Sequence, residues 1–215
     1  MKRPTILLVN CSKNRDGNCG ELLSSVAEEL KKLEADTERF WIGADHITGC
    51  KFCHGCMETG RCVIDDRVNT FIEKATEADG FFIAAPQTRM TSNGSIDAML
   101  ERAFRAKLDA FRLKPYALVT LARRMSEDSG ANRLSATIAS AEMPMIGRKY
   151  WNLTGDGRDP RELFKNKSNV RELSSMVQNL LYFVRCIDVG CDAGLIRPSR
   201  AQTAFDPLDI FGTEK

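Results

Sequence analysis

The chain has 215 residues, of which 43% are hydrophobic and 28% are charged. This length and balance are typical of one globular domain with a full core. Lysine and arginine total 31 against 29 acidic residues, a net charge of +2, which argues against nucleic acid or an anionic membrane as a partner. No apolar run reaches membrane-spanning length, and the first one stops at Asn10, too short for a signal peptide. We therefore expect a cytoplasmic protein.

Apolar runs alternate with amphipathic stretches along the chain, a pattern that predicts alternating strands and helices. The predicted strands are Thr5–Asn10, Thr37–Ile42, Gly80–Ala85, Tyr116–Leu121 and Pro144–Tyr150. The predicted helices are Cys19–Leu33, a helix capped by Asp65 or Asp66 that runs to Ala75, Ser95–Ala110, Asn132–Glu142 and Val170–Ile187. Residues 151–168 are expected to be irregular.

This alternation indicates a parallel sheet covered by helices on both faces. Five strands suit an α/β doubly wound sheet of the flavodoxin type, with strand order 2-1-3-4-5. We expect this domain to span residues 1–190 and residues 191–215 to form a C-terminal arm. Ligands of such sheets lie beyond the carboxyl ends of the strands, which points to the loops after strands one, three and four.

Four of the eight cysteines lie close together, at Cys50, Cys53, Cys56 and Cys62. In a reducing cytosol this spacing favours metal ligation over disulfides. A structural zinc site usually takes two separated pairs of ligands, whereas here two C-x2-C units share a cysteine, which suits a cubane with four separate irons. Residues 49–63 therefore predict a [4Fe–4S] site, with zinc and incidental cysteines as the alternatives.

A polar loop from Cys11 to Asn18 connects the first strand to the first helix. Such a turn aims free backbone N–H groups, and the positive end of the helix dipole, at an anion. Ser12 and Asn18 can donate further hydrogen bonds, and Lys13 or Arg15 can pair with charge. The loop is neither a G-x-G-x-x-G fingerprint nor a Walker loop. A single phosphate, as in FMN, fits it; the alternative is an ordinary loop before a capped helix.

Together these segments resemble the NADPH-dependent FMN reductase and flavodoxin-like superfamily and, within it, the iron–sulfur flavoproteins. Three stretches carry the resemblance: the loop Asn10–Asn18, the cysteine segment Gly49–Asp66, and Ala85–Thr88 with the following Ser95–Arg102. The matching order extends over about residues 4–150. The compact cysteine pattern is the most specific of the three.

The resemblance implies FMN at the carboxyl edge of the sheet. The positions that it assigns to FMN are Cys11, Ser12, Lys13, Gly17, Asn18 and Cys19 for the phosphate, Pro86, Gln87 and Thr88 for the ring, and Ala122 and Arg123 at the other margin of the ring. Three departures weaken the match: Cys11 and Cys19 replace hydroxyl residues that would donate to phosphate, Gln87-Thr88 replaces an apolar–aromatic pair, and Arg123-Arg124 replaces a glycine-richer stretch. The resemblance also implies a homodimer or homotetramer with one subunit's cluster near another's flavin.

The working hypothesis is an electron relay between a one-electron carrier of the ferredoxin type and a two-electron acceptor, which requires no catalytic side chain. One alternative is an NAD(P)H-dependent flavin or quinone reductase whose cysteines bind zinc or nothing. Another is a non-enzymatic sensor or scaffold in which a flavodoxin-like shell holds a structural metal.

Overall fold

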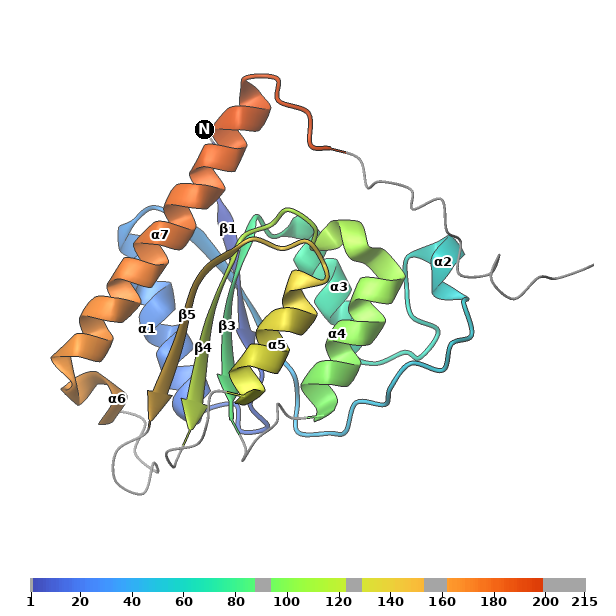
Figure 1. The fold of residues 1–215 in the computed structure, drawn as a ribbon, viewed down its shortest axis with the longest axis horizontal. Helices are drawn as coiled ribbons and strands as arrows, with labels where there is room; N and C mark the ends of the chain where they lie inside the picture. Colours follow the sequence, from blue (N-terminus) through green and yellow to red (C-terminus); the bar gives the residue numbers. More distant parts are fainter. Residues whose placement is uncertain (1, 88–93, 123–128, 153–161, 199–215) are drawn as a thin grey trace, which may run out of the picture. The chain divides into compact units, whose positions relative to one another are not determined.

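The computed structural model describes residues 2–87, 94–122, 129–152 and 162–198. Its centre is a five-stranded parallel sheet of order β2-β1-β3-β4-β5 (Figure 1). The strands are β1 (Thr5–Asn10), β2 (Asp36–Trp41), β3 (Gly80–Pro86), β4 (Tyr116–Ala122) and β5 (Met145–Asn152). The predicted fold class and strand order are confirmed, and the predicted strand bounds differ from these by at most two residues.

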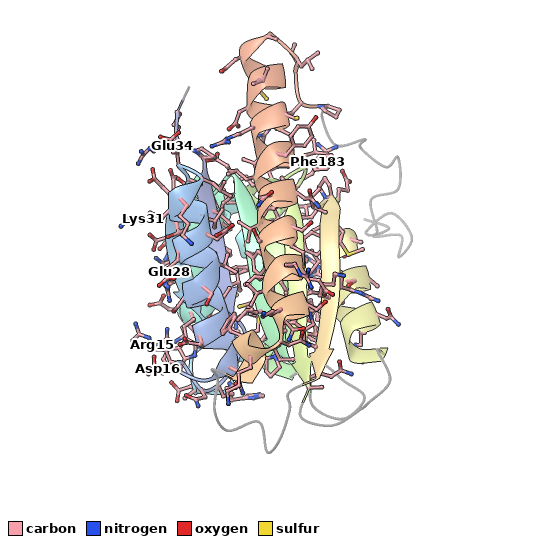
Figure 2. All side chains as sticks on the ribbon, turned by 90° about the vertical axis from the view of Figure 1, so that its left-hand side faces the viewer. Arg15, Asp16, Glu28, Lys31, Glu34 and Phe183 are labelled. Carbon is pink, nitrogen blue, oxygen red and sulfur yellow. The ribbon has the colours of Figure 1, made fainter. Side chains whose placement is uncertain are left out.

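Helices cover both faces of the sheet. On one face lie α1 (Asn18–Lys32) and α7 (Lys167–Asp192), side by side in Figure 2. On the other face lie α3 (Arg67–Glu77), α4 (Gly94–Lys107) and α5 (Ser129–Ala139). Three short elements were not predicted, since a single turn is too short to show an apolar stripe: α2 (Cys56–Thr59), the 3₁₀ turn η1 (Leu108–Ala110) and α6 (Glu162–Lys165).

Each face of the sheet has its own hydrophobic core. Ile6 and Leu8 of β1 belong to the core formed with α1 and α7, whereas Leu7 and Val9 belong to the core formed with α3 and α4. Successive side chains of a strand point to opposite faces. A strand buried on both faces therefore consists of a continuous apolar run, as β1 does.

The chain divides into two compact units, residues 1–185 and 186–215. In the described part of the second unit, Gly194 has a φ of 91° and ends α7, and the Leu195 N–H donates to Gly190 O at 2.9 Å. Glycine adopts this left-handed conformation at helix ends without a steric penalty. In the parts of the chain that are described, no helix has both the length and the apolar character that crossing a membrane requires.

Candidate functional site

The segment between β2 and α3 brings the four predicted metal ligands together. Cys50, Cys53, Cys56 and Cys62 line one small pocket of about 20 Å³. Phe52 and His54, between these cysteines, have φ values of 52° and 57°, a left-handed conformation that non-glycine residues rarely adopt. These two residues turn the backbone sharply. Within the described ranges, no group of three or more His, Cys, Asp or Glu side chains is arranged to hold a single metal ion.

The other three pocket cysteines act electrostatically on Cys56. Burial raises the pKa of Cys56, and proximity to Cys62, Cys50 and Cys53 raises it further. Like charges disfavour joint ionisation at such a site, so four thiolates require compensating positive charge. A metal provides that charge, because thiol ligands lose their protons when it binds.

Arg102 of α4 anchors this segment through hydrogen bonds. Its side chain is completely buried, and all five of its N–H donors are used. The acceptors are Cys62 Sγ at 3.3 Å, Thr48 O and Ile64 O at 3.1 Å each, and the two carboxylate oxygens of Asp66 at 2.7 and 2.9 Å. One guanidinium therefore joins the two ends of the cysteine segment and one of its sulfur atoms.

Asn69 and Asp66 add a second anchor at the end of the segment. Asn69 Oδ1 accepts from the Cys62 N–H at 2.8 Å, and Asn69 Nδ2 donates to Cys62 O at 2.9 Å and Ile64 O at 3.4 Å. Asp66 caps α3 by accepting from the Val68 N–H at 3.0 Å. The structure thus selects Asp66 from the two capping residues that the sequence allowed.

The sequence interpretation missed Arg102 and Asn69 as part of the site. A signal existed for Arg102, which lies three residues after Met99 and next to Ala103 on the buried stripe of α4. A charged residue on an apolar stripe is almost always paired. No comparable signal marks Asn69.

The strand exits predicted to hold flavin meet at one edge of the sheet. Pro86 pairs with Leu121 in the register of β3 and β4, so Gln87 and Ala122 follow as neighbours. The Gln87 N–H donates to Leu121 O at 2.8 Å, and the Cys11 N–H donates to Ala84 O at 2.9 Å. The exits of β1, β3 and β4 are thereby held together. Thr88 and Arg123, the other two predicted ring contacts, lie outside the described residues.

The loop from Cys11 to Gly17 is shaped by its own polar side chains. Backbone N–H groups of Ser12, Asn14 and Asp16 donate to side-chain oxygens two residues earlier, at 2.9, 3.2 and 3.3 Å. Asn10 Nδ2 closes the loop by donating to Arg15 O at 3.0 Å. Such side chain-to-backbone bonds are the reason why Asn and Ser recur in tight turns.

The start of α1 is open to an anion. Its N-cap is Gly17, which forms no side-chain capping bond. The Gly17 carbonyl accepts from the Glu21 N–H at 3.0 Å, so the N–H groups before Glu21 receive no side-chain bond from the N-cap. A Cβ on Gly20 would lie 2.2 Å from Arg15 O, so the close approach of the loop to the helix requires glycine there. Lys13 donates from its ammonium group to the Asp45 carbonyl.

Cys11 and Cys19 lie in the cores below this loop, on opposite faces of the sheet. They are 1% and 3% exposed. Burial raises the pKa of both thiols, to about 12 for Cys19. Both are therefore neutral thiols at physiological pH, and their packing is that of small apolar residues.

The two candidate sites lie at different ends of α4 (Figure 1). Gly94 begins α4 next to the carboxyl edge of the sheet, whereas the cysteine segment with α2 lies against the last turns of the helix. Arg102 and Arg105 follow Gly94 by eight and eleven residues, which places them about 12–17 Å along the helix axis. Around the cysteine pocket, Phe52, Met57 and Val63 are 58–68% exposed.

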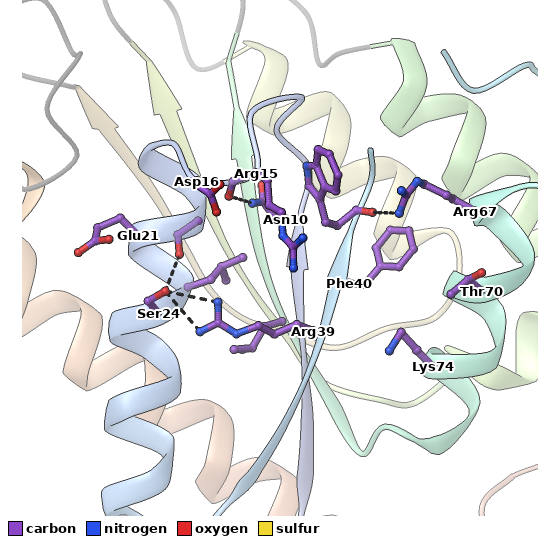
Figure 3. A pocket seen from close by; sticks show the side chains of 14 residues that line it. Asn10, Arg15, Asp16, Glu21, Ser24, Arg39, Phe40, Arg67, Thr70 and Lys74 are labelled. Atoms are coloured by element: carbon purple, nitrogen blue, oxygen red, sulfur yellow. Dashed lines mark hydrogen bonds between the residues drawn. The ribbon is translucent and has the colours of Figure 1, made fainter. Parts of the chain in front are cut away.

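A third feature is a groove of about 520 Å³ beside β2, between α1 and α3. Figure 3 shows Arg39 and Ser24 on one side of it and Arg67 and Lys74 on the other. We call it the basic groove. Its charged lining residues are Arg15, Asp16, Glu21, Arg39, Arg67 and Lys74.

Comparisons with known proteins show which sequences and folds this chain resembles. The family described as NADPH-dependent FMN reductase matches residues 4–157. An iron–sulfur flavoprotein of Methanosarcina thermophila is 25% identical over 130 residues, which cover 60% of this chain and 68% of that protein. An iron–sulfur flavoprotein of Archaeoglobus fulgidus is 31% identical over 109 residues, which cover 51% of this chain and 53% of that protein. The second alignment thus spans about half of the relative.

Among solved structures, RosB with the bound intermediate 8-demethyl-8-formylriboflavin-5'-phosphate superposes with a TM-score of 0.65. The sequences are 16% identical, and the superposition covers 94% of each chain. At this identity the likeness concerns the fold alone.

Proposed function

Because this chain belongs to the NADPH-dependent FMN reductase family and is an FMN-dependent oxidoreductase, we propose that it is an iron–sulfur flavoprotein. In this proposal it carries a [4Fe–4S] cluster and relays electrons between a one-electron carrier of the ferredoxin type and a two-electron acceptor. The observation that carries the proposal is the single pocket lined by Cys50, Cys53, Cys56 and Cys62. The names of the two archaeal relatives support it.

The residues present fit both groups. The four cysteines would hold the cluster, and Arg102 and Arg105 line the same pocket with positive charge. The uncapped start of α1 would bind the FMN phosphate, with Ser12 and Asn18 as side-chain donors. Pro86, Gln87, Thr88, Ala122 and Arg123 would contact the flavin ring. When bound, the cluster supplies single electrons and the flavin accepts one or two.

The protein's own contribution is binding and positioning, since this chemistry requires no side chain as acid or base. The loop at Cys11–Gly17 is fixed by its own hydrogen bonds, which reduces the conformational entropy that ligand binding must overcome. Burial of Cys11 and Cys19 as neutral thiols keeps these two sulfurs out of metal ligation. We place the protein in the reducing cytoplasm, where the pocket thiols stay available for iron.

We further propose that the cluster and flavin that exchange electrons belong to different subunits of a homodimer or homotetramer. In one subunit, the cysteine pocket lies against the end of α4 that is remote from the strand exits. The exposed Phe52, Met57 and Val63 are each adjacent in sequence to a cysteine of this pocket. Exposed apolar side chains that gather at one place are typical of protein contact surfaces.

The alternative function is direct reduction of flavin or quinone by NAD(P)H, with zinc or nothing on the cysteines. The description of the matching family favours it. It predicts FMN without iron and rapid bleaching of the flavin by NADPH alone.

Purification without oxygen, followed by counts of iron, sulfide, zinc and FMN, tests the proposal. We expect about four irons and four sulfides per chain, one FMN, and a mass in solution of two or four chains. Stoichiometric zinc, or a colourless protein, would contradict it. Flavin without iron that NADPH reduces directly would establish the alternative.

A further inference from the structure

Arg102 stands out because its side chain combines full burial with complete use of its donors. Its Nη1 and Nη2 groups bind Thr48 O, Ile64 O and both oxygens of Asp66. Thr48 lies two residues before Cys50, and Ile64 lies two residues after Cys62. The two ends of a segment with little regular structure are therefore brought to one point on α4.

The remaining donor, Nε–H, is directed at Cys62 Sγ at 3.3 Å. Asp66 compensates the charge of the guanidinium through a bidentate pair. The contact with sulfur therefore acts chiefly as a directional hydrogen bond. Hydrogen bonds to cluster sulfurs and local net charge are the protein's means of adjusting a cluster's reduction potential.

We propose that Arg102 is a positioning residue for the cluster: it fixes Cys62 in the ligand set, and its Nε–H bond raises the reduction potential. This inference rests on the proposed [4Fe–4S] function. Reduction adds negative charge to the cluster, so a donor on sulfur stabilises the reduced state more than the oxidised one. Loss of the donor shifts the potential to a more negative value.

Arg102→Lys tests this inference because it keeps the positive charge and removes the planar guanidinium with its Nε–H donor. Arg61→Lys is the matched control, since Arg61 lies in the same segment, is more than half exposed and does not line the pocket. In redox titrations of the anaerobic protein, followed by visible absorbance, we expect a lower midpoint potential for R102K and an unchanged midpoint potential for R61K. Loss of iron from R102K with FMN retained would support the positioning role equally.

A wild-type potential and full iron content in R102K would overturn the inference. If R102K fails to fold, Asp66→Asn takes its place, because Asn remains a good N-cap and leaves the guanidinium uncompensated. The expected shift is then to a higher potential, and an unchanged potential overturns the inference. Wild-type protein without iron and sulfide would instead refute the proposed function, so the two failures are distinguishable.

The basic groove carries a second inference, independent of the cluster. Four cations and two carboxylates line it, a surplus of two positive charges. Lys74 pairs with Glu38, but among the described residues Arg15, Arg39 and Arg67 form no ion pair with a carboxylate. Arg39 donates to Ser24 Oγ at 3.3 Å, and Arg67 donates to Trp41 O at 3.3 Å.

Two of these arginines also flank the same indole. Arg15 lies 5.9 Å and Arg67 5.1 Å from the centroid of the Trp41 ring. The ring attracts each cation, but their mutual repulsion is not relieved by a carboxylate partner. An anion between them would relieve it.

We infer that the basic groove binds a small organic phosphate with at least two negative charges, of the nucleoside diphosphate class. Arginine forks match phosphate oxygens in pairs. The volume of about 520 Å³ falls within the range of about 300–1,000 Å³ that is typical of small-molecule pockets, which favours such a ligand over an acidic protein surface.

Calorimetric titration of the FMN-saturated protein with ADP tests this site, with adenosine as the uncharged probe. The double variant Arg39→Gln with Arg67→Gln removes two cations, and Arg3→Gln, an exposed arginine outside the groove, is the control. We expect ADP binding, at least a tenfold loss of affinity in the double variant, wild-type affinity in R3Q and no binding of adenosine. Absence of ADP binding to wild-type protein, or equal affinity in the double variant, would overturn the inference.

Discussion

The cysteine segment and the β1–α1 loop are both irregular connections that follow a strand, but they are held in opposite ways. The hydrogen bonds that shape the β1–α1 loop join residues two to five positions apart. The bonds from Arg102 to the cysteine segment span 38 to 54 positions, and those from Asn69 reach the segment from α3 over 5 to 7 positions. The conformation of the β1–α1 loop is therefore fixed by hydrogen bonds within the loop, whereas that of the cysteine segment is fixed by side chains of α3 and α4.

This difference follows from what each loop must present. A phosphate is bound by backbone N–H groups at a helix start, which a short self-contained turn arranges. Four sulfur ligands must instead converge from a segment whose thiolates repel one another. Such a segment requires donors from outside it, which buried Arg102 supplies, and counter-charge, which a bound metal would supply.

Removal of one pocket sulfur gives the sharpest contrast between the two regions. In Cys56→Ser we expect iron to fall from about four atoms per chain to fewer than one, because the cluster loses a ligand. In Cys11→Ala we expect iron to be unchanged, because Cys11 is a buried core thiol. Iron and sulfide analysis of anaerobic protein measures both. Equal iron loss in both variants would show that the two regions are not separate.

Loss of a loop anchor tests the same contrast through stability. Asn69→Ala removes the acceptor of the Cys62 N–H and the donor to two carbonyls, which we expect to cost about 2–4 kcal/mol of unfolding free energy. Asn10→Ala removes the two local bonds of the β1–α1 loop, at an expected cost of about 1–2 kcal/mol. Urea denaturation gives both values.

Iron content separates the two variants further: Asn69→Ala should lose iron, and Asn10→Ala should retain it. A result in which Asn10→Ala is the more destabilised, or loses more iron, would reverse the comparison between the loops.

The same contrast explains how much the sequence could predict. The strands and the buried faces follow from local periodicity and apolar runs, and a helix start at Asp65 or Asp66 follows from a capping signal, because each signal lies within one element. The order 2-1-3-4-5 follows from the alternation of strands and helices, which is typical of doubly wound sheets. The cysteine pattern predicted which residues converge because their spacing is short. Interactions between residues that are close in sequence can therefore be predicted from a single sequence.

Arg102 shows where sequence reasoning ends. It lies 40 residues from Cys62 and 54 from Thr48. The sequence around Arg102 does not indicate which segment its N–H groups bind. The basic groove combines β1, β2, α1 and α3, so its charge balance emerges only when these elements pack. Features built by packing of distant elements require the structure.

Alkaline titration tests the buried thiols of Cys11 and Cys19, which differ from the four thiols of the cysteine pocket. Burial raises the pKa of Cys19 from 9.0 to about 12 and that of Cys11 in the same direction. The unfolded chain therefore ionises first. The contribution of these thiols to stability is complete below about pH 9 and is lost as the pH rises towards 12, by up to about 1.4 kcal/mol per pH unit for each thiol.

Urea denaturation at intervals between pH 8 and 11 measures this loss. In Cys19→Ala the slope against pH should be shallower by about 1.4 kcal/mol per pH unit. An identical slope in the variant would mean that the Cys19 thiol does not resist ionisation in the folded chain.

The smallest effect is expected at the surface of the cysteine segment, where Arg61 pairs with Glu73 of α3. Both side chains are more than half exposed, at 54% and 56%, and such pairs contribute about 0–1 kcal/mol. Glu73→Gln should therefore change the unfolding free energy by less than about 0.5 kcal/mol and leave iron content at the wild-type value. A larger loss, or release of iron, would mean that solvent-facing charge holds the segment. The buried donors of Arg102 and Asn69 would then be secondary, and the contrast with the β1–α1 loop would need another cause.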